Sequence, residues 1–110
     1  MKTKIHPARV LSGNYDLHPL ETVHLDGAQA AQPGIVRIGA GTRSPPEGLR
    51  TSARHEIAYV IAGRARIDTA EGSTIVGAGD VVVSSPTEPH ATTALEDTTV
   101  SYILIDPPGA

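Results

Sequence analysis

The sequence contains no cysteine, phenylalanine or tryptophan, and its three aromatic residues are all tyrosines. Without cysteine the chain forms no disulfides and no thiolate nucleophile, and a cysteine-based zinc site is excluded. Without Phe and Trp, the core must be filled by Val, Ile, Leu and Ala. The chain also lacks the aromatic platforms on which proteins stack the bases of single-stranded nucleic acids.

Basic clusters and long hydrophobic runs are missing as well. Nine Lys and Arg residues stand against twelve Asp and Glu residues, for a formal net charge of -3, which disfavours binding to a phosphate backbone. No segment has the length and hydropathy of a signal peptide or a membrane-spanning helix. We therefore expect a soluble, cytoplasmic protein that binds a small molecule and neither nucleic acid nor membranes.

Short strand-like segments separated by turn residues dominate the sequence. At 110 residues the chain is long enough for one domain with a real core and too short for a second. Its 11 Gly and 9 Pro residues divide Val-, Ile- and Thr-rich segments at the spacing typical of an antiparallel sandwich or barrel. The predicted strands are 22–25, 35–40, 56–61, 65–69, 73–76, 81–84, 90–94 and 98–106. The nearest helical candidate, 26–32, has one or two turns and is stopped by Pro33 and Gly34.

The strand predicted at 56–61 is apolar on both faces. Alternation puts Glu56 on one face with two apolar residues, and puts Ile57, Tyr59 and Ile61 on the other. The run 100–105 has the same character. Because a strand with one buried face alternates with polar residues, something must cover the outer face. We predict a homodimer; the alternative is that the N-terminal segment folds over this surface.

Two segments carry a recognisable spacing. In the first, Glu56 is followed by six residues and Gly63; in the second, His90 lies eleven positions after Gly79. These spacings resemble the two halves of the cupin signature, and the resemblance covers about 35–105. It implies an all-β, double-stranded β-helix (jelly-roll) barrel. We therefore expect a single cupin domain over 1–110, with an N-terminal arm and edge strands at 1–33 and the barrel core at 34–106.

The chain departs from the signature at the histidine pair of its first half. Counting back from Glu56 puts Arg50 and Ser52 at the two histidine positions. Counting forward from the turn near residue 41 puts Glu47 and Leu49 there instead. The second half also departs, since residues 85–87 read Ser-Pro-Thr where the signature has proline, any residue and glycine. Both registers of the first half remain open.

The resemblance implies one divalent metal ion, such as Zn, Fe, Mn or Ni, held by imidazoles and a carboxylate. Glu56 and His90 occupy two of the four ligand positions, and two ligands alone would hold an ion weakly. His55 and Glu47 are the candidates for a third ligand. Because neighbouring strand residues point to opposite faces, His55 joins Glu56 only from a loop or a bulge. Both a metal site and a metal-free site therefore stay open.

Without a metal, Glu56 and His90 form a candidate general acid and base, because imidazole exchanges protons near neutral pH. Arg37 and Arg50 are candidates to bind an anionic group such as a carboxylate. Ser52, at the second missing histidine position, is the third candidate for substrate binding. Oxygen activation needs a firmly held redox metal, so the altered pair favours proton-transfer chemistry.

We therefore expect a small-molecule enzyme of isomerase, lyase or cyclase type that acts on a small polar metabolite. The alternative is a non-catalytic ligand-binding or sensing module without metal, in which Arg50 or Arg54 neutralises Glu56. Tyr59 and Tyr102, which lie among aliphatic residues, are expected in the core or an interface.

Overall fold

The structure is a computed structural model that describes residues 3–25 and 29–107. The described chain contains strands and connecting loops but no helix, so no helix of these residues is long and apolar enough to cross a membrane. The strands are β1 Tyr15–Pro19, β2 Val23–His24, β3 Ala30–Ile38, β4 Arg43–Ser44, β5 His55–Ala62, β6 Arg64–Thr69, β7 Gly72–Gly77, β8 Val81–Ser84, β9 His90–Ala94 and β10 Thr98–Ile105.

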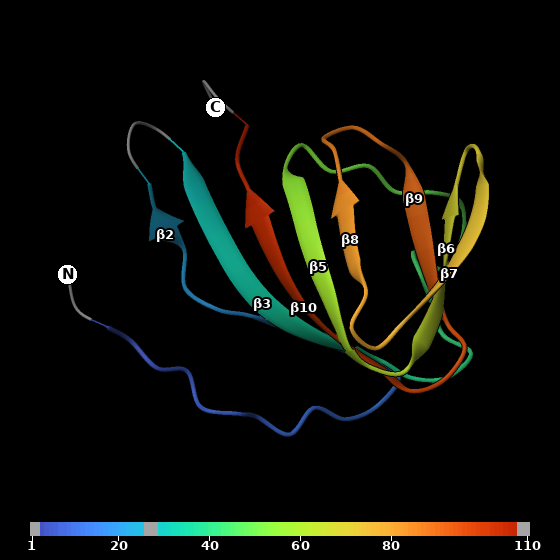
Figure 1. The fold of residues 1–110 in the computed structure, drawn as a ribbon, viewed down its shortest axis with the longest axis horizontal. Coiled ribbons are helices and arrows are strands. Elements are labelled where there is room, and N and C mark those ends of the chain that lie inside the picture. Colours follow the sequence, from blue (N-terminus) through green and yellow to red (C-terminus); the bar gives the residue numbers. More distant parts are fainter. Residues whose placement is uncertain (1–2, 26–28, 108–110) are drawn as a thin grey trace.

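These strands form two antiparallel sheets that face each other (Figure 1). The larger sheet has the order β1-β3-β10-β5-β8, with β2 also paired to β3, and the smaller has the order β4-β9-β6-β7. The β4–β5 and β8–β9 connections cross from one sheet to the other at the same end, the upper end in Figure 1. We call this end the rim. The expected all-β jelly-roll architecture is confirmed.

All eight predicted strands are present; seven differ by at most one residue at each end, whereas β3 begins five residues earlier than predicted, and two further strands, β1 and β4, were not predicted. The helical candidate at 26–32 is wrong where it can be checked, because Ala30 already begins β3; residues 26–28 lie outside the described residues. Pro33 is accommodated inside β3 because its carbonyl accepts from Leu20, on the side away from β10. The donor that proline lacks would point to that same side, so no bond to β10 is lost.

The core lies between the sheets and follows the alternation predicted for β5. Ala58 and Val60 are 9% and 2% exposed, whereas Ile57 and Tyr59, on the other face, are 39% and 48% exposed. The buried apolar side chains are small and mostly aliphatic: Val36, Ile38, Ala58, Val60, Ala65, Ala91, Ala94 and Tyr102.

Two glycines allow this packing. At Gly34, in β3, any side chain would collide with the ring and hydroxyl of Tyr102. Gly63, which closes the first motif, has a φ of 92° and turns β5 into β6. A side chain at Gly63 would also meet the backbone of Asp97 and Thr98. Both positions therefore need glycine, the first for close approach and the second for its backbone conformation as well.

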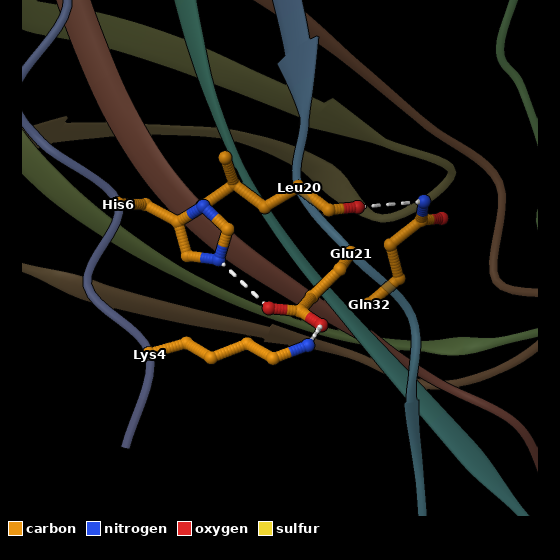
Figure 2. A network of polar contacts seen from close by, with 5 residues as sticks. All are labelled: Lys4, His6, Leu20, Glu21 and Gln32. Carbon is orange, nitrogen blue, oxygen red and sulfur yellow. Dashed lines mark hydrogen bonds and ion pairs between the residues drawn. The ribbon is translucent and has the colours of Figure 1, made fainter. Parts of the chain in front are cut away.

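The N-terminal arm runs outside the larger sheet and is held by polar contacts (Figure 2). Lys4 Nζ lies 2.8 Å from one carboxylate oxygen of Glu21, and His6 Nε2 lies 2.9 Å from the other. These contacts hold the pKa of Glu21 below its usual value, with the hydrogen bond from Lys4 as the largest cause and that from His6 next.

The arm covers one part of the outer face of the larger sheet. Ala8, Arg9 and Leu11 line a small hollow together with Ile35, Arg37, Ile61 and Thr99. The N-terminal segment therefore covers the outer face, as the alternative to a dimer predicted, only around this hollow. The apolar side chains that β5 and β8 present to the outside remain exposed, with Val81 59% and Val83 67% exposed.

Candidate functional site

Glu56 and His90 meet at the rim, although 34 positions separate them in the sequence. Glu56 is the second residue of β5 and pairs with Ser84 at the end of β8, whereas His90 begins β9 in the opposite sheet. His90 Nε2 lies 4.0 Å from Glu56 Oε2, and the two side chains are 24% and 29% exposed. The spacing of the two motifs thus brings a carboxyl group and an imidazole to one place.

The orientation of the His90 ring follows from its other nitrogen. Nδ1 lies 3.3 Å from the carbonyl oxygen of Glu88. Because a carbonyl can only accept, Nδ1 is the nitrogen that carries a proton in this arrangement. Nε2 is therefore the atom directed at Glu56. At 4.0 Å the pair is too long for a direct hydrogen bond, so each group stays able to bond to a third molecule.

The structure distinguishes between the two possible registers of the missing histidine pair. Arg50 pairs with His90 through two backbone hydrogen bonds of 2.9 and 3.0 Å. Arg50 and Ser52 line the same cavity as Glu56 and His90. Glu47 and Leu49 are exposed and are not part of the cavity wall. Arg50 and Ser52 therefore lie in the cavity wall with Glu56 and His90, as the first of the two registers predicts.

This cavity lies between the two sheets and has a volume of about 360 Å³. It falls at the small end of the roughly 300–1,000 Å³ typical of small-molecule sites. Its interior is aliphatic, with Val36, Ile38, Val60, Ile67, Val82, Val100 and Leu104 among its residues. Its polar side chains are Tyr15, Ser44, Arg50, Thr51, Ser52, Arg54, Glu56, Ser84, His90, Thr92 and Tyr102.

The residues of the rim do not fit the metal centre that the family resemblance implies. His55 pairs in regular register with Ile105, next to the Leu104 partner of Glu56, so its side chain leaves β5 on the opposite face. Glu47 is exposed. Across residues 3–25 and 29–107, no three His, Asp or Glu side chains come together as a metal site would need. The Arg50 guanidinium, placed where a ligand would be, also opposes a cation.

Arg37, predicted to bind substrate, is not in the cavity. Its Nε donates to the Gly13 carbonyl at 3.1 Å, and its Nη2 lies 3.2 Å from Asp97 Oδ2, both outside the barrel. The reason is the alternation of β3, in which the apolar Val36 and Ile38 fill the inner face. The guanidinium between them faces outward, where water and a carboxylate stabilise its charge.

Seven polar cavity residues were not predicted as site residues, and two of them, Arg54 and Tyr102, carry groups suited to binding an anion. Arg54 Nη1 lies 3.4 Å from the amide oxygen of Gln32, and Tyr102 is only 6% exposed. Strand alternation could have predicted the position of Arg54, because Arg54 precedes Glu56 by two positions and so lies on the same face. Glu56 has its ion-pair contact with His90, and within the described residues it has none with Arg50 or Arg54.

Burial raises the pKa of Tyr102, and the nearby Tyr15 and Glu56 raise it further, while Arg54 acts in the opposite direction. The phenol therefore keeps its proton at neutral pH and is a hydrogen-bond donor. The cavity wall therefore contains a neutral donor within electrostatic reach of a carboxyl group and a guanidinium.

Comparisons with known proteins agree with this fold. The cupin-domain family model matches residues 34–106, whereas a search of curated proteins finds no match. A conserved protein of unknown function from Streptococcus pyogenes has a similar structure, with a TM-score of 0.66 at 18% identity over 96% of this chain and 93% of the other.

Two further solved structures are similar. A cupin superfamily protein from Desulfitobacterium hafniense gives a TM-score of 0.70 at 11% identity, over 89% of this chain and 84% of the other. Ectoine synthase from P. lautus gives 0.59 at 20% identity, over 67% of this chain and 52% of the other. At such identities the likeness shows the fold alone, and these neighbours include both an enzyme and a protein of unknown function. The family match, which covers most of the chain, shows that this protein belongs to the cupin family.

Proposed function

We propose that this cupin is an enzyme of isomerase, lyase or cyclase type that transfers protons on a small polar metabolite bound in the barrel cavity. The observation that carries the proposal is the 4.0 Å separation of His90 Nε2 and Glu56 Oε2 in the wall of that cavity. A carboxyl group and an imidazole are the side chains most used for general acid and base catalysis.

The two groups take complementary roles. Glu56, as a carboxylate, removes a proton from a carbon or hydroxyl of the substrate, and the protonated His90 ring delivers a proton from Nε2 to the receiving atom. The proton taken up by Glu56 then returns to His90 across the 4.0 Å gap, directly or through water. The reaction consumes no net proton, and it needs no oxidant or reductant.

Arg50 and Ser52 support this chemistry as substrate-binding residues. The backbone of Arg50 pairs with that of His90, and the Arg50 guanidinium donates to the Ser44 hydroxyl at 2.8 Å in the wall of the same cavity. The Ser52 hydroxyl accepts a hydrogen bond from the Arg54 backbone at 3.1 Å, which leaves its own proton free to donate. Since the donor set of the rim does not fit a metal ion, no step of the proposed reaction passes through one.

The test is exchange of substrate hydrogen with solvent deuterium, followed by NMR over a panel of small hydroxy acids, oxo acids and sugars. We expect catalysed exchange into at least one compound, and a loss of about 100- to 10,000-fold in Glu56→Gln and in His90→Gln. Glu96→Gln and His24→Gln, which change exposed residues outside the cavity, are the matched controls. Exchange that survives both cavity substitutions would contradict the proposal. Binding without any exchange would favour the alternative, a non-catalytic ligand-binding or sensing module.

We also propose that the protein is a homodimer, in which two copies bury the exposed outer face of the larger sheet. We define the outer patch as Ile57, Tyr59, Val81, Val83 and Ile103, which are 39–67% exposed. Register places Val83, Ile57 and Ile103 side by side on three adjacent strands, with Tyr59 and Val81 paired beside them.

The character of the outer patch favours a second copy of this chain as its partner. The patch contains no charged side chain, so two identical patches meet without repulsion between like charges. It reaches β8, the last strand of its sheet. The outer face of the smaller sheet differs, because it carries the Arg66–Asp68 ion pair at 3.0 Å. An apolar patch on one sheet and ion pairs on the other indicate which face is buried in the assembly.

A further inference from the structure

Among the described residues, the two arginines of the cavity lack the carboxylate partner that three of the five arginines outside it have. Three arginines that face outward each have a carboxylate partner at 2.9–3.2 Å. Arg50 and Arg54, in the cavity wall, bond only to neutral oxygens, the Ser44 hydroxyl at 2.8 Å and the Gln32 amide at 3.4 Å. Two guanidinium groups against the single carboxyl group of Glu56 leave an excess of one positive charge. The cavity is therefore complementary to a monoanion.

The Tyr102 hydroxyl is a second group without a partner. The residue is 94% buried, as only 6% of it is exposed, and its hydroxyl has no hydrogen bond within the described residues. Among the described residues, the fully enclosed side-chain atom without a hydrogen-bond partner is Thr93 Oγ1 and not the Tyr102 hydroxyl. The Tyr102 hydroxyl is therefore not fully enclosed. Because Tyr102 lines the cavity, its hydroxyl is open to the cavity. Buried tyrosine hydroxyls normally find a partner. This one is free to donate to a ligand.

Arg54 and Tyr102 lie on the same side of the site. Both Arg54 and Glu56 perturb the titration of Tyr102, so the hydroxyl is within electrostatic reach of each. The pairing of β10 with β5 sets Tyr102 opposite Ala58 and Leu104 opposite Glu56, which makes Tyr102 and Glu56 diagonal neighbours on one face. The Tyr102 hydroxyl lies over Gly34, and Arg54 contacts Gln32 two positions earlier in the same strand, so an anion held by both would lie over β3, across β10 from Glu56.

We propose that Arg54 and the Tyr102 hydroxyl bind the carboxylate of a small monocarboxylic acid, whose compact aliphatic part occupies the apolar interior of the cavity. The guanidinium supplies paired N–H donors and the phenol supplies an O–H donor, a set that suits the two oxygens of a carboxylate. The interior supplies aliphatic contacts to the rest of the ligand, and its volume of about 360 Å³ limits the ligand to a small acid.

This assignment rests on the proposed function and narrows its substrate class. A carboxylate held by Arg54 and Tyr102 over β3 leaves the rest of the ligand to extend across β10 towards Glu56, which lies 4.0 Å from His90. Arg50, on the His90 side, remains available to a second oxygen of the substrate, such as a hydroxyl or an oxo group.

The experiment measures binding rather than turnover, by isothermal titration calorimetry on the full chain. The probes are 3-methylbutanoate and 2-hydroxy-3-methylbutanoate, each compared with its primary amide, which has the same shape but no charge. We expect both acids to bind and both amides to bind at least tenfold more weakly. Arg54→Gln and Tyr102→Phe should each weaken the acids by about tenfold to a hundredfold, the range for hydrogen bonds to a charged group.

The matched control is Arg64→Gln, which removes an exposed arginine outside the cavity and should leave the affinity unchanged. Tyr102→Phe keeps the ring packed over Gly34, and an unchanged circular dichroism spectrum and melting temperature will establish that it folds. The proposal is overturned if the amides bind as well as the acids, if neither variant weakens binding, or if neither acid binds at about 10 mM.

The failure of this proposal is distinguishable from failure of the proposed function. Acids that bind through Arg54 and Tyr102 but never exchange hydrogen would leave the carboxylate site standing and refute the catalysis. Hydrogen exchange that requires Glu56 and His90 but is unchanged in the Arg54 and Tyr102 variants would support the catalysis and refute the carboxylate site.

Discussion

The contact between Gly34 and Tyr102 yields a sharp prediction about how the cavity wall is built. Replacing Gly34 with alanine would put a methyl group into the space of the Tyr102 ring and hydroxyl. Tyr102 is 94% buried and cannot swing into solvent. The strain must therefore be taken up by β3 or by β10, which are paired at this position.

The expected cost follows from two opposing effects. Overpacking of a core by one methyl group costs about 1–3 kcal/mol. Alanine also restricts the unfolded chain relative to glycine, and this stabilises the protein by about 0.4–1 kcal/mol wherever the backbone accepts it. Gly34 is not among the glycines with positive φ, so its backbone accepts alanine. The overlap with Tyr102 puts the overpacking cost in the upper part of its range, so the net expectation for Gly34→Ala is a destabilisation of about 1–2.6 kcal/mol.

The assay is urea unfolding followed by circular dichroism, for Gly34→Ala alone and in a Tyr102→Leu background. Leucine does not extend as far as the tyrosine ring and hydroxyl, so Gly34→Ala should become neutral there or stabilise by up to about 1 kcal/mol. Gly77→Ala is the matched control, because a methyl group at this strand glycine meets Arg64 Cγ at an ordinary 3.6 Å. The reasoning is refuted if Gly34→Ala costs less than about 0.5 kcal/mol, or costs the same in both backgrounds.

Two further predictions concern the outside of the barrel. A hydrogen bond from the Ala40 backbone, and next one from Arg37, hold the pKa of Asp97 below its usual value. The ionised Asp97 therefore stabilises the folded protein above the unfolded pKa of about 4, and this stabilisation is lost as the pH falls through the lower pKa of the folded state. Asp97→Asn should therefore flatten the loss of stability in acid, measured by urea unfolding from neutral pH downwards, and an unchanged acid profile would count against the contact. Val83→Lys, which places a charge in the outer patch, should convert the proposed dimer to a monomer in light scattering after size exclusion. A wild-type protein that is already monomeric at micromolar concentration would rule out the dimer.

Local sequence signals were sufficient for most strands. Segments rich in β-branched residues and bounded by Gly or Pro became strands, because such residues favour the pleated backbone and the turn residues end it. β1 was missed because its sequence, YDLHP, is short and partly polar, and β4 because it has only two residues. Residues 30–32 were misassigned because the composition of their segment suits a helical turn, whereas long-range pairing with β10 and β2 extends β3 back to Ala30.

The candidate site could be predicted only in part. The spacing of Glu56, Gly63, Gly79 and His90 indicated a carboxyl group and an imidazole in one barrel, and the structure places these two groups 4.0 Å apart. The register of the missing histidines stayed open, because a loop of unknown path separates residue 41 from β5. The backbone pairing between Arg50 and His90 favours the register with Arg50 and Ser52, and that pairing joins segments 40 positions apart.

The sequence by itself determined the all-β class, the positions of most strands, and which residues of a strand share a face. It also determined that the chain has too few histidines near Glu56 for the usual metal centre of its family. Only the tertiary structure decided that Arg37 faces outward, that Arg54 and Tyr102 join the cavity, and that His55 is paired within β5 rather than carried by a loop or a bulge. The physical reason is that alternation along a strand is a local property of the backbone, whereas the direction in which each face points depends on which distant strands pair and which side chains fill the space between the sheets.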